Sequence, residues 1–308
     1  MIRFVALRLL RALVTVLAVM TFAFVVLRMS GDPAEVLMGP DVPQDAIDAF
    51  RTQWGLDAPL WQQYFSYLGA ILSGDFGMSM RDRSPAIQLV IERIPATLQL
   101  TIPALLLKLG IGIPAGIYAA LHRDSAVDRG VIFLAILGFT IPSFVMGLVL
   151  VLIFAVTLGV LPSGGIGSWQ HAILPAITIS IGGIGILARF SRSAMIEVLG
   201  QPYIRTASAK GVKWRDVVRG HALPNAAVPI VTIVGFMVGS LIAGAVVVET
   251  IFSWPGIGRL LIVSVSNRDL AVVQCILLLI AAVMVVSNLI VDLLYGWLDP
   301  RLRAQPAH

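Results

Sequence analysis

The sequence predicts an all-α integral membrane protein with six transmembrane helices. Hydrophobic residues make up 58% of the 308-residue chain and charged residues only 13%, whereas a soluble domain carries roughly 25% charged residues. The apolar residues lie in long continuous runs, each able to cross roughly 30 Å of hydrocarbon. Because lipid satisfies no backbone hydrogen bonds, such runs must form helices or a closed barrel, and their continuity favours helices over ten-residue alternating strands.

The expected spans follow one another with polar segments between them. The N-terminal run follows a basic start, as in a signal peptide, but it is too long for such a peptide and no A-x-A site follows it, so we expect it to be retained. The single cysteine, Cys275, lies in the last run and excludes an internal disulfide or a CxxC site. The predicted spans are approximately 10–26, 96–121, 131–158, 172–188, 226–248 and 271–295.

The distribution of basic residues predicts the orientation. Cytoplasmic segments of membrane proteins are enriched in Lys and Arg. With the N-terminus inside, the inside segments carry 14 Lys and Arg residues and the outside segments carry 7. We therefore expect both termini and the basic segment 189–224 to be cytoplasmic.

The segment between the first and second spans is long, acidic and rich in aromatic residues. It covers 30–94 and contains nine Asp and Glu residues. Its stretch LWQQYFSYLGAIL has the amphipathic spacing of a helix that lies along a membrane surface. Two interpretations stay open, a small packed cap and a docking platform for an external partner. The predicted organisation is a first helix in 1–29, an external segment in 30–94 and a core domain in 95–308 with five spans.

The sequence lacks the motifs of an enzyme. None of its four histidines pairs with another at metal-ligand spacing, and neither HExxH nor GxSxG occurs. None of the three lysines follows a glycine, so there is no Walker A sequence. We expect no catalytic residue, no metal site and no cofactor held by this chain.

Few ionisable residues interrupt the spans. Lys108 lies in the second span, where it either lines a translocation path or pairs or faces water in an assembled bundle. The pairs Gly112-x-x-x-Gly116 and Gly235-x-x-x-Gly239 are typical of closely packed helices. Such Gly-rich spans serve either plain packing or a bundle that rocks between two states. We place Lys108, Gly239 and Gly244 on a candidate path.

A basic segment, RTASAKGVKWRDVVRGHALPNA, interrupts the apolar chain from Arg205 to Ala226. We expect a short helix that ends at Gly211, a residue suited to a left-handed turn. A second short helix is expected to stop before Pro224. The small residues of the first helix would fit a groove on another protein. The alternative is an ordinary positive loop that touches anionic lipid.

The spacing within this segment resembles the EAA loop of ABC importer permeases. That pattern is E-A-A, three residues, G, nine residues and I-x-L-P, and here Arg205-Thr206-Ala207, Gly211 and His221-Ala222-Leu223-Pro224 stand at its places. Arg205, Thr206 and His221 depart from it. YIRTASAKG and HALPNA resemble the dipeptide, oligopeptide and nickel branch, as do PLWQQYFSYLGAILSGDFGMSM, ERIPATLQLT, VVVETIFSWPGIGRLL and WLDPRLR.

The resemblance implies a MetI-like type I permease fold in a bacterial inner membrane. The chain would form half of a translocation path with a second homologous permease as a heterodimer. Two cytoplasmic ATPase subunits would bind ATP and Mg, and an extracytoplasmic solute-binding protein would deliver the substrate. The residues that would dock an ATPase subunit are Arg205, Thr206, Ala207, Ser208, Lys210, Gly211, His221, Leu223 and Pro224.

The resemblance implies a peptide substrate, with nickel chelates, glutathione and haem-like cargo as alternatives. Two other classes of protein were weighed. A stand-alone secondary transporter or channel predicts intramembrane charge pairs and internal repeats, and neither is evident. A scaffold that only anchors other proteins needs no water-accessible path.

Overall fold

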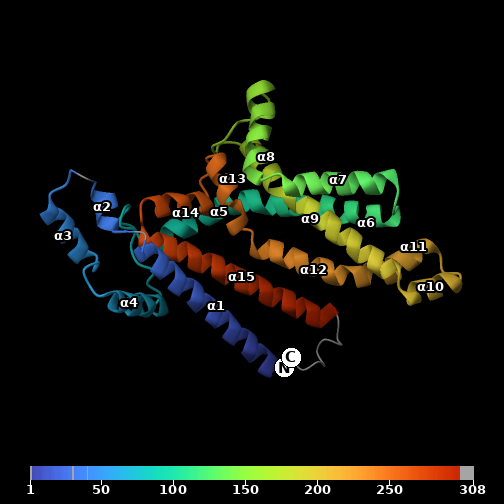
Figure 1. Cartoon of the computed structure of the whole chain (residues 1–308), viewed down its shortest axis with the longest axis horizontal. Helices are drawn as coiled ribbons and strands as arrows, with labels where there is room; N and C mark the ends of the chain where they lie inside the picture. The colour runs from blue at the N-terminus through green and yellow to red at the C-terminus, as the bar shows by residue number, and fades with distance from the viewer. Residues whose placement is uncertain (1, 30, 40, 299–308) are drawn as a thin grey trace. The chain divides into compact units, whose positions relative to one another are not determined.

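The computed structural model describes residues 2–29, 31–39 and 41–298, and these are helical apart from turns and one isolated bridge between Met78 and Pro85. Within the described residues, five helices are long and apolar enough to cross a membrane, and a bent helix pair would be a sixth (Figure 1). The all-α prediction is therefore confirmed, with five to six candidate spans. The C-terminal stretch DPRLR lies outside the described residues.

The chain divides into two compact units that interleave along the sequence. One contains Leu98–Trp254 and the chain from Met284, and the other contains Ile2–Thr97 and Pro255–Val283. The second unit holds most of the predicted external segment. Its helices are α1 (Ile2–Met29), α2 (Pro33–Met38), α3 (Gln44–Gln53), α4 (Leu60–Leu72), α14 (Ile257–Ser266) and the first parts of α5 (Ala86–Leu107) and α15 (Leu270–Leu298).

Polar contacts hold the second unit together around a small apolar cluster. Leu27, Leu270 and Val273 form the buried part of that cluster. The buried Ser79 hydroxyl donates a hydrogen bond to the Asp269 carboxylate. Because Ser79 precedes α5 and Asp269 precedes α15, this bond joins segments that are far apart in the sequence.

The first unit is built around the long helix α9 (Ile173–Leu199), against which α6, α7, α8 and α12 pack. Figure 1 shows α6 and α7 running beside α9. The remaining elements are α6 (Ile113–Leu121), α7 (Ala126–Thr140), α8 (Ser143–Leu150), α10 (Pro202–Ala209), α11 (Trp214–Val217), α12 (Leu223–Gly239) and α13 (Val246–Ile251), with π-helical turns at η1 (Lys108–Gly112), η2 (Val151–Thr157) and η4 (Val218–Ala222) and 3₁₀ turns at η3 (Trp169–Ala172) and η5 (Ala243–Ala245).

Both predicted glycine pairs pack closely against a neighbouring helix. A Cβ atom on Gly112 would lie 2.8 Å from the Leu187 Cβ atom, and one on Gly116 would collide with the Ala188 carbonyl oxygen of α9. A Cβ atom on Gly235 would likewise collide with the side chain of Val291 in α15. The absence of a side chain therefore sets these interhelical distances, as the G-x-x-x-G pattern predicts.

The predicted third span at 131–158 corresponds to a bent pair of helices, which is either one broken span or a re-entrant loop. Helix α7 ends at Thr140, and α8 begins at Ser143 after a bend of 100°. Ile141 is extended, with φ −73° and ψ 121°, the geometry that a following proline favours because its ring crowds a helical residue before it. Pro142 therefore separates two helices instead of producing the moderate kink that a span tolerates.

The prediction that a second short helix stops before Pro224 is also wrong. Helix α11, the π-turn η4 and α12 form one helical segment, Trp214–Gly239, which is a candidate span. Pro224 lies in the first turn of α12. The wider hydrogen-bond spacing of the preceding π-turn leaves room for a residue without an N–H group.

The fifth span consequently lies earlier than the predicted 226–248. Helix α12 ends at Gly239, and the chain turns at Ser240 before it reaches the short 3₁₀ turn η5. Gly244 lies in that turn instead of inside a span.

Candidate functional site

The basic segment folds as a short helix and a turn that leads directly into α12. We call residues 201–224 the coupling segment. It follows the end of α9 at Leu199, and α10 starts at Pro202 after the extended residue Gln201. Proline is favoured in the first helical turn because its missing N–H group has no partner there in any helix. The coupling segment therefore begins within three residues of the central helix of the unit.

Helix α10 is fixed to the rest of the unit by one buried side chain, Ile204. This residue is 3% exposed and lies in a cluster with Met195 of α9, Val217 of α11 and residues of η4 and α12. Ile113 and Ile117 of α6 pack against the same cluster. Ile204 therefore places α10 in one apolar cluster with residues of three candidate spans.

The opposite face of α10 is exposed and carries basic side chains. Arg205, Ala209 and Lys210 are exposed, as is Thr206. The hydroxyl of Thr206 donates to the Pro202 carbonyl at 3.1 Å. Within the described part of the chain, Arg205 forms no ion pair or side-chain hydrogen bond. Its charge is therefore available to a partner protein.

Exposed aromatic side chains border this basic face. Tyr203 is 42% exposed and Trp214 is 54% exposed. Lys213, Arg215 and Arg219 are exposed nearby in the sequence. Tyr, Trp and Arg are the residues most enriched in protein–protein interfaces.

Gly211 produces the predicted turn after α10. Its φ is +79°, in the left-handed region. The Val212 N–H donates to the Ala207 carbonyl at 3.3 Å, and the Gly211 N–H donates to the Ser208 carbonyl at 3.0 Å. This pair of bonds satisfies the last carbonyl groups of the helix and confirms the expected glycine stop.

Substitution of Gly211 by alanine is expected to destabilise the turn by about 1–2 kcal/mol, the cost of a side chain in left-handed backbone geometry. No atom lies within 4 Å of the Cβ position, so the effect is backbone strain alone. Thermal unfolding of the purified chain measures it. Gly220→Ala is the matched control, because Gly220 also has an empty Cβ position but no positive φ. Equal midpoints for the two variants would contradict the strain argument.

The remaining predicted docking residues are divided between two faces. Ala207 and Leu223 are half-buried and pack against the Ile204 cluster. His221 and Pro224 are exposed. The Asn225 side chain donates to the His221 carbonyl at 2.7 Å and supports the backbone of η4 just before α12. The structure thus gives Ala207 and Leu223 contacts within the chain itself.

Sequence reasoning missed an ion pair between α7 and α9. The Arg192 Nε and Nη2 atoms lie 2.5 Å and 2.7 Å from the two carboxylate oxygens of Asp128. Asp128 is 3% exposed and also accepts the Asp124 N–H at 3.0 Å. Ser125 caps α7 by accepting the Asp128 N–H. The S-x-x-D capping pattern was a signal for Asp128, but nothing local identifies a partner 64 residues away.

The three predicted path residues lie in different surroundings. Lys108 is half-buried in the π-turn η1, and its aliphatic stem crosses Gly183 of α9, where a Cβ atom would lie 2.6 Å from the Lys108 Cδ and Cε atoms. In the described residues, Lys108 has no hydrogen-bond or ion-pair partner. Gly239 is buried against Ser287 of α15, whereas Gly244 is exposed.

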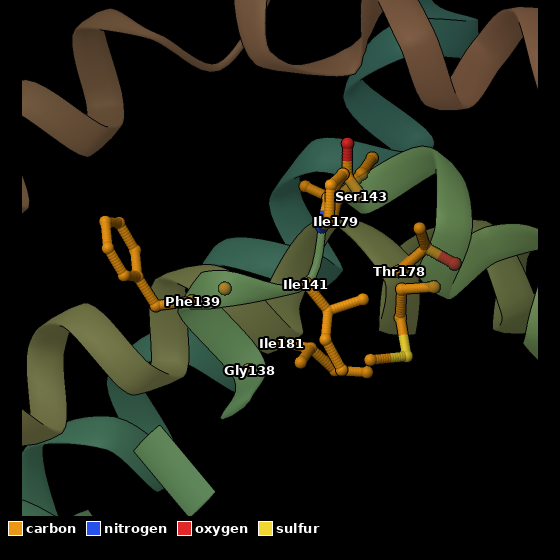
Figure 2. Close-up of a pocket in the computed structure, with 10 residues that line it drawn as sticks. Gly138, Phe139, Ile141, Ser143, Thr178, Ile179 and Ile181 are labelled. Carbon is orange, nitrogen blue, oxygen red and sulfur yellow. The ribbon is translucent and has the colours of Figure 1, made fainter. Parts of the chain in front are cut away.

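A small cavity lies at the bend between α7 and α8. Figure 2 shows Ile141, Ser143 and Thr178 around it, with residues of α9 forming one wall. Its volume is about 190 Å³, below the roughly 300 Å³ at which small-molecule sites begin. The Thr178 hydroxyl donates to the Leu174 carbonyl. The cavity therefore offers no charged group and too little room for a peptide.

Comparisons with known proteins match nearly the whole length of the chain. Residues 112–304 match the family described as binding-protein-dependent transport system inner membrane component, and residues 1–101 match the corresponding N-terminal family. The chain is 40% identical over 304 residues to the glutathione transport system permease protein GsiC of Escherichia coli (strain K12), covering 98% of this chain and 99% of that protein.

The protein of the same name from Salmonella choleraesuis (strain SC-B67) is 43% identical over 305 residues, with the same coverage. The fold resembles that of an inward-facing MetNI methionine ABC transporter structure, with a TM-score of 0.59 and 19% identity over 70% of this chain and 98% of that chain.

Proposed function

Because the chain belongs to the family of binding-protein-dependent transport system inner membrane components, and is thus a permease subunit of a bacterial ABC importer, we propose that it forms half of a translocation path for short peptides. A second homologous permease supplies the other half. Two cytoplasmic ATPase subunits bind ATP and Mg, and a solute-binding protein delivers the substrate on the opposite side of the membrane. Both termini and the coupling segment face the cytoplasm in this arrangement.

One observation carries the choice of substrate. The relatives at 40% and 43% identity, which match along nearly the entire chain, are named as permeases for glutathione, itself a small peptide. We therefore place glutathione and other short peptides ahead of nickel chelates and haem as substrates.

The coupling segment supplies the mechanical connection in this proposal. The exposed face of α10 docks in a groove of an ATPase subunit, while Ile204 holds the other face against α6, α9 and α12. Movement of the ATPase subunits on ATP binding then shifts these helices together. Such coupling biases an equilibrium between two states and needs no catalytic group in the permease.

Lys108 and Gly244 are proposed to line the path. Lys108 is a basic side chain within a candidate span and has no partner among the described residues, which supports a functional instead of a structural role. Gly239 stays a prediction for the assembled importer, since in this chain it faces α15.

The experiment that tests the proposal is uptake of labelled glutathione and of a labelled dipeptide into vesicles that contain both permeases, the ATPase subunits and the binding protein. We expect ATP-dependent uptake that is lost when the ATPase subunits are omitted. Uptake by this chain alone would contradict the permease role, and ATP-dependent uptake of nickel or haem but not of peptide would contradict the substrate.

A docking variant is tested in the same vesicles. Ala209 is exposed on α10, whereas Ala207 is half-buried against the Ile204 cluster. Ala209→Trp therefore blocks the proposed docking face without disturbing the packing of the chain. We expect it to abolish association with the ATPase subunits. Ala126→Trp, which enlarges an exposed alanine in the first turn of α7, is the control and should assemble normally. Full ATPase association by Ala209→Trp would exclude this face as the docking surface.

A further inference from the structure

An apolar groove lies between α1 and α4, and the guanidinium group that lines it has one buried nitrogen atom. Its volume is about 310 Å³, and Phe24, Val25 and Arg28 of α1 and Trp61 and Tyr64 of α4 line it. All of these residues belong to the same compact unit. The groove begins at the last turns of a candidate span, Leu10–Met29, so it lies at one end of the hydrophobic part of the chain.

Aromatic contacts fix the two walls of this groove. The Phe24 and Tyr64 rings meet edge to face with their centroids 5.2 Å apart, and Phe24 stacks on Tyr67 at 6.0 Å. The hydroxyl groups of Thr21 and Tyr64 lie 2.6 Å apart and hydrogen-bond to each other. These contacts hold α4 against α1.

The guanidinium group of Arg28 has an unsatisfied donor. Its Nε atom is buried and has no hydrogen-bond partner among the residues that the structure describes. The guanidinium lies 5.5 Å from the centre of the Phe24 ring, which orients it but accepts no conventional hydrogen bond. The nearest acidic residue that acts on it, Asp32, is already bonded to Arg51 at 2.6 Å and to the Ala34 N–H. A buried donor on a charged group is costly unless an acceptor reaches it.

The aromatic hydroxyl groups do not neutralise this charge. Burial raises the pKa of Tyr67 to about 12, so its phenol stays uncharged at physiological pH. Trp61 presents only an N–H donor and is 67% exposed at the mouth of the groove. The groove therefore combines a positive charge, donors and an apolar floor.

We propose that this groove binds an anionic phospholipid, with the phosphodiester accepting hydrogen bonds from the Arg28 guanidinium and an acyl chain lying along Phe24 and Val25. Guanidinium groups match phosphate oxygens in geometry and charge. The apolar walls distinguish a lipid from free phosphate, which would gain nothing from Val25 or the Trp61 ring. Aromatic side chains such as Trp61 and Tyr64 are typical at the depth of lipid headgroups. Val25 is 44% exposed, so an acyl chain can reach it from the bilayer.

The test uses the purified full-length chain in detergent, titrated with phosphatidylglycerol, phosphatidylcholine or inorganic phosphate. Native mass spectrometry counts the bound lipids, and thermal unfolding reports stabilisation. We expect phosphatidylglycerol to remain bound and to raise the unfolding temperature, whereas phosphatidylcholine and inorganic phosphate do neither. Arg28→Gln should weaken phosphatidylglycerol binding by about tenfold, the effect of losing hydrogen bonds from a charged group.

Two further variants distinguish lipid binding in the groove from a general effect of positive charge. Val25→Trp fills the groove while leaving Arg28 in place, and it should also lose phosphatidylglycerol. Arg81→Gln removes one exposed positive charge from the same unit and should bind as the unchanged chain does. If Arg28→Gln does not fold, Val25→Trp decides the question. Phosphatidylglycerol binding unchanged in Val25→Trp, equal binding of phosphatidylcholine, or equal protection by inorganic phosphate would each overturn the proposal.

Discussion

Replacement of Arg192 by methionine is expected to reduce the free energy of unfolding by about 2–3 kcal/mol, because the Asp128 carboxylate loses both hydrogen bonds from a charged partner that is itself partly exposed. Asp128 is 3% exposed, and its two carboxylate oxygens accept both hydrogen bonds from Arg192 at 2.5 Å and 2.7 Å. Without Arg192, that carboxylate stays buried between α7 and α9. Thermal unfolding in detergent measures the loss.

Two companion variants make this result specific. Arg129→Met removes the neighbouring exposed arginine, which donates only to the Asp124 carbonyl, and should change stability by less than about 0.5 kcal/mol. The double variant Asp128→Leu/Arg192→Met should recover much of the lost stability, because an apolar pair of similar size avoids the buried charge. An unfolding temperature for Arg192→Met equal to that of Arg129→Met would contradict a structural role for the pair.

The same substitution tests how the coupling segment works. Arg192 lies two turns before the end of α9, and α10 begins three residues after that end. The ion pair therefore fixes the part of α9 that carries α10. In the reconstituted importer we expect Arg192→Met to reduce the ratio of substrate taken up to ATP hydrolysed. Arg129→Met should leave this ratio as it is in the unsubstituted protein.

Addition of a single methyl group at Gly116 is expected to have the second-largest effect. The Cβ atom of Gly116→Ala would collide with the Ala188 carbonyl oxygen and lie 2.8 Å from the Ser191 Cβ atom. Because the carbonyl belongs to the α9 backbone, α6 and α9 must separate along this contact. We expect a loss of about 1–3 kcal/mol, the range for overpacked interiors, measured by thermal unfolding.

Gly130→Ala is the matched control for this substitution. Gly130 lies in α7 with nothing within 4 Å of its Cβ position. Alanine there should be neutral or stabilise the helix by up to about 1 kcal/mol, because it lowers the backbone entropy of the unfolded chain. If both variants unfolded at the same temperature, close helix packing at Gly116 could not be the reason for its glycine.

Local features of the sequence predicted a large part of the fold. Continuous apolar runs indicated the membrane-spanning helices, since hydropathy over 20 residues depends on no distant contact. Gly112 and Gly116 identified a close helix contact, and Gly211 identified the turn after α10, because both depend on the missing side chain of the residue itself. The spacing from Arg205 to Pro224, together with the resemblance of stretches along the rest of the chain, identified the family that the comparisons then confirmed.

Whether a proline interrupts a helix depends on the hydrogen bonding and packing around it, and hydropathy does not report these. Pro142 and Pro224 both follow apolar or mixed stretches, yet the first separates two helices by a bend of 100° and the second lies within a continuous helical segment. Leu223 before Pro224 keeps helical dihedral angles, whereas Ile141 before Pro142 is extended. Neighbouring packing decides between these outcomes, because either one accommodates the missing N–H group.

The sequence by itself therefore determined the class of protein, the approximate spans, the glycine contacts and the position of the coupling segment. Only the tertiary structure decided which face of α10 is anchored by Ile204, that Asp128 pairs with Arg192, and that Arg28 lies in a groove formed with α4. Hydropathy, turn geometry and small-residue spacing depend on residues that are close together in the sequence. Ion pairs, buried anchors and grooves join residues tens of positions apart, so they exist only once the helices have packed together.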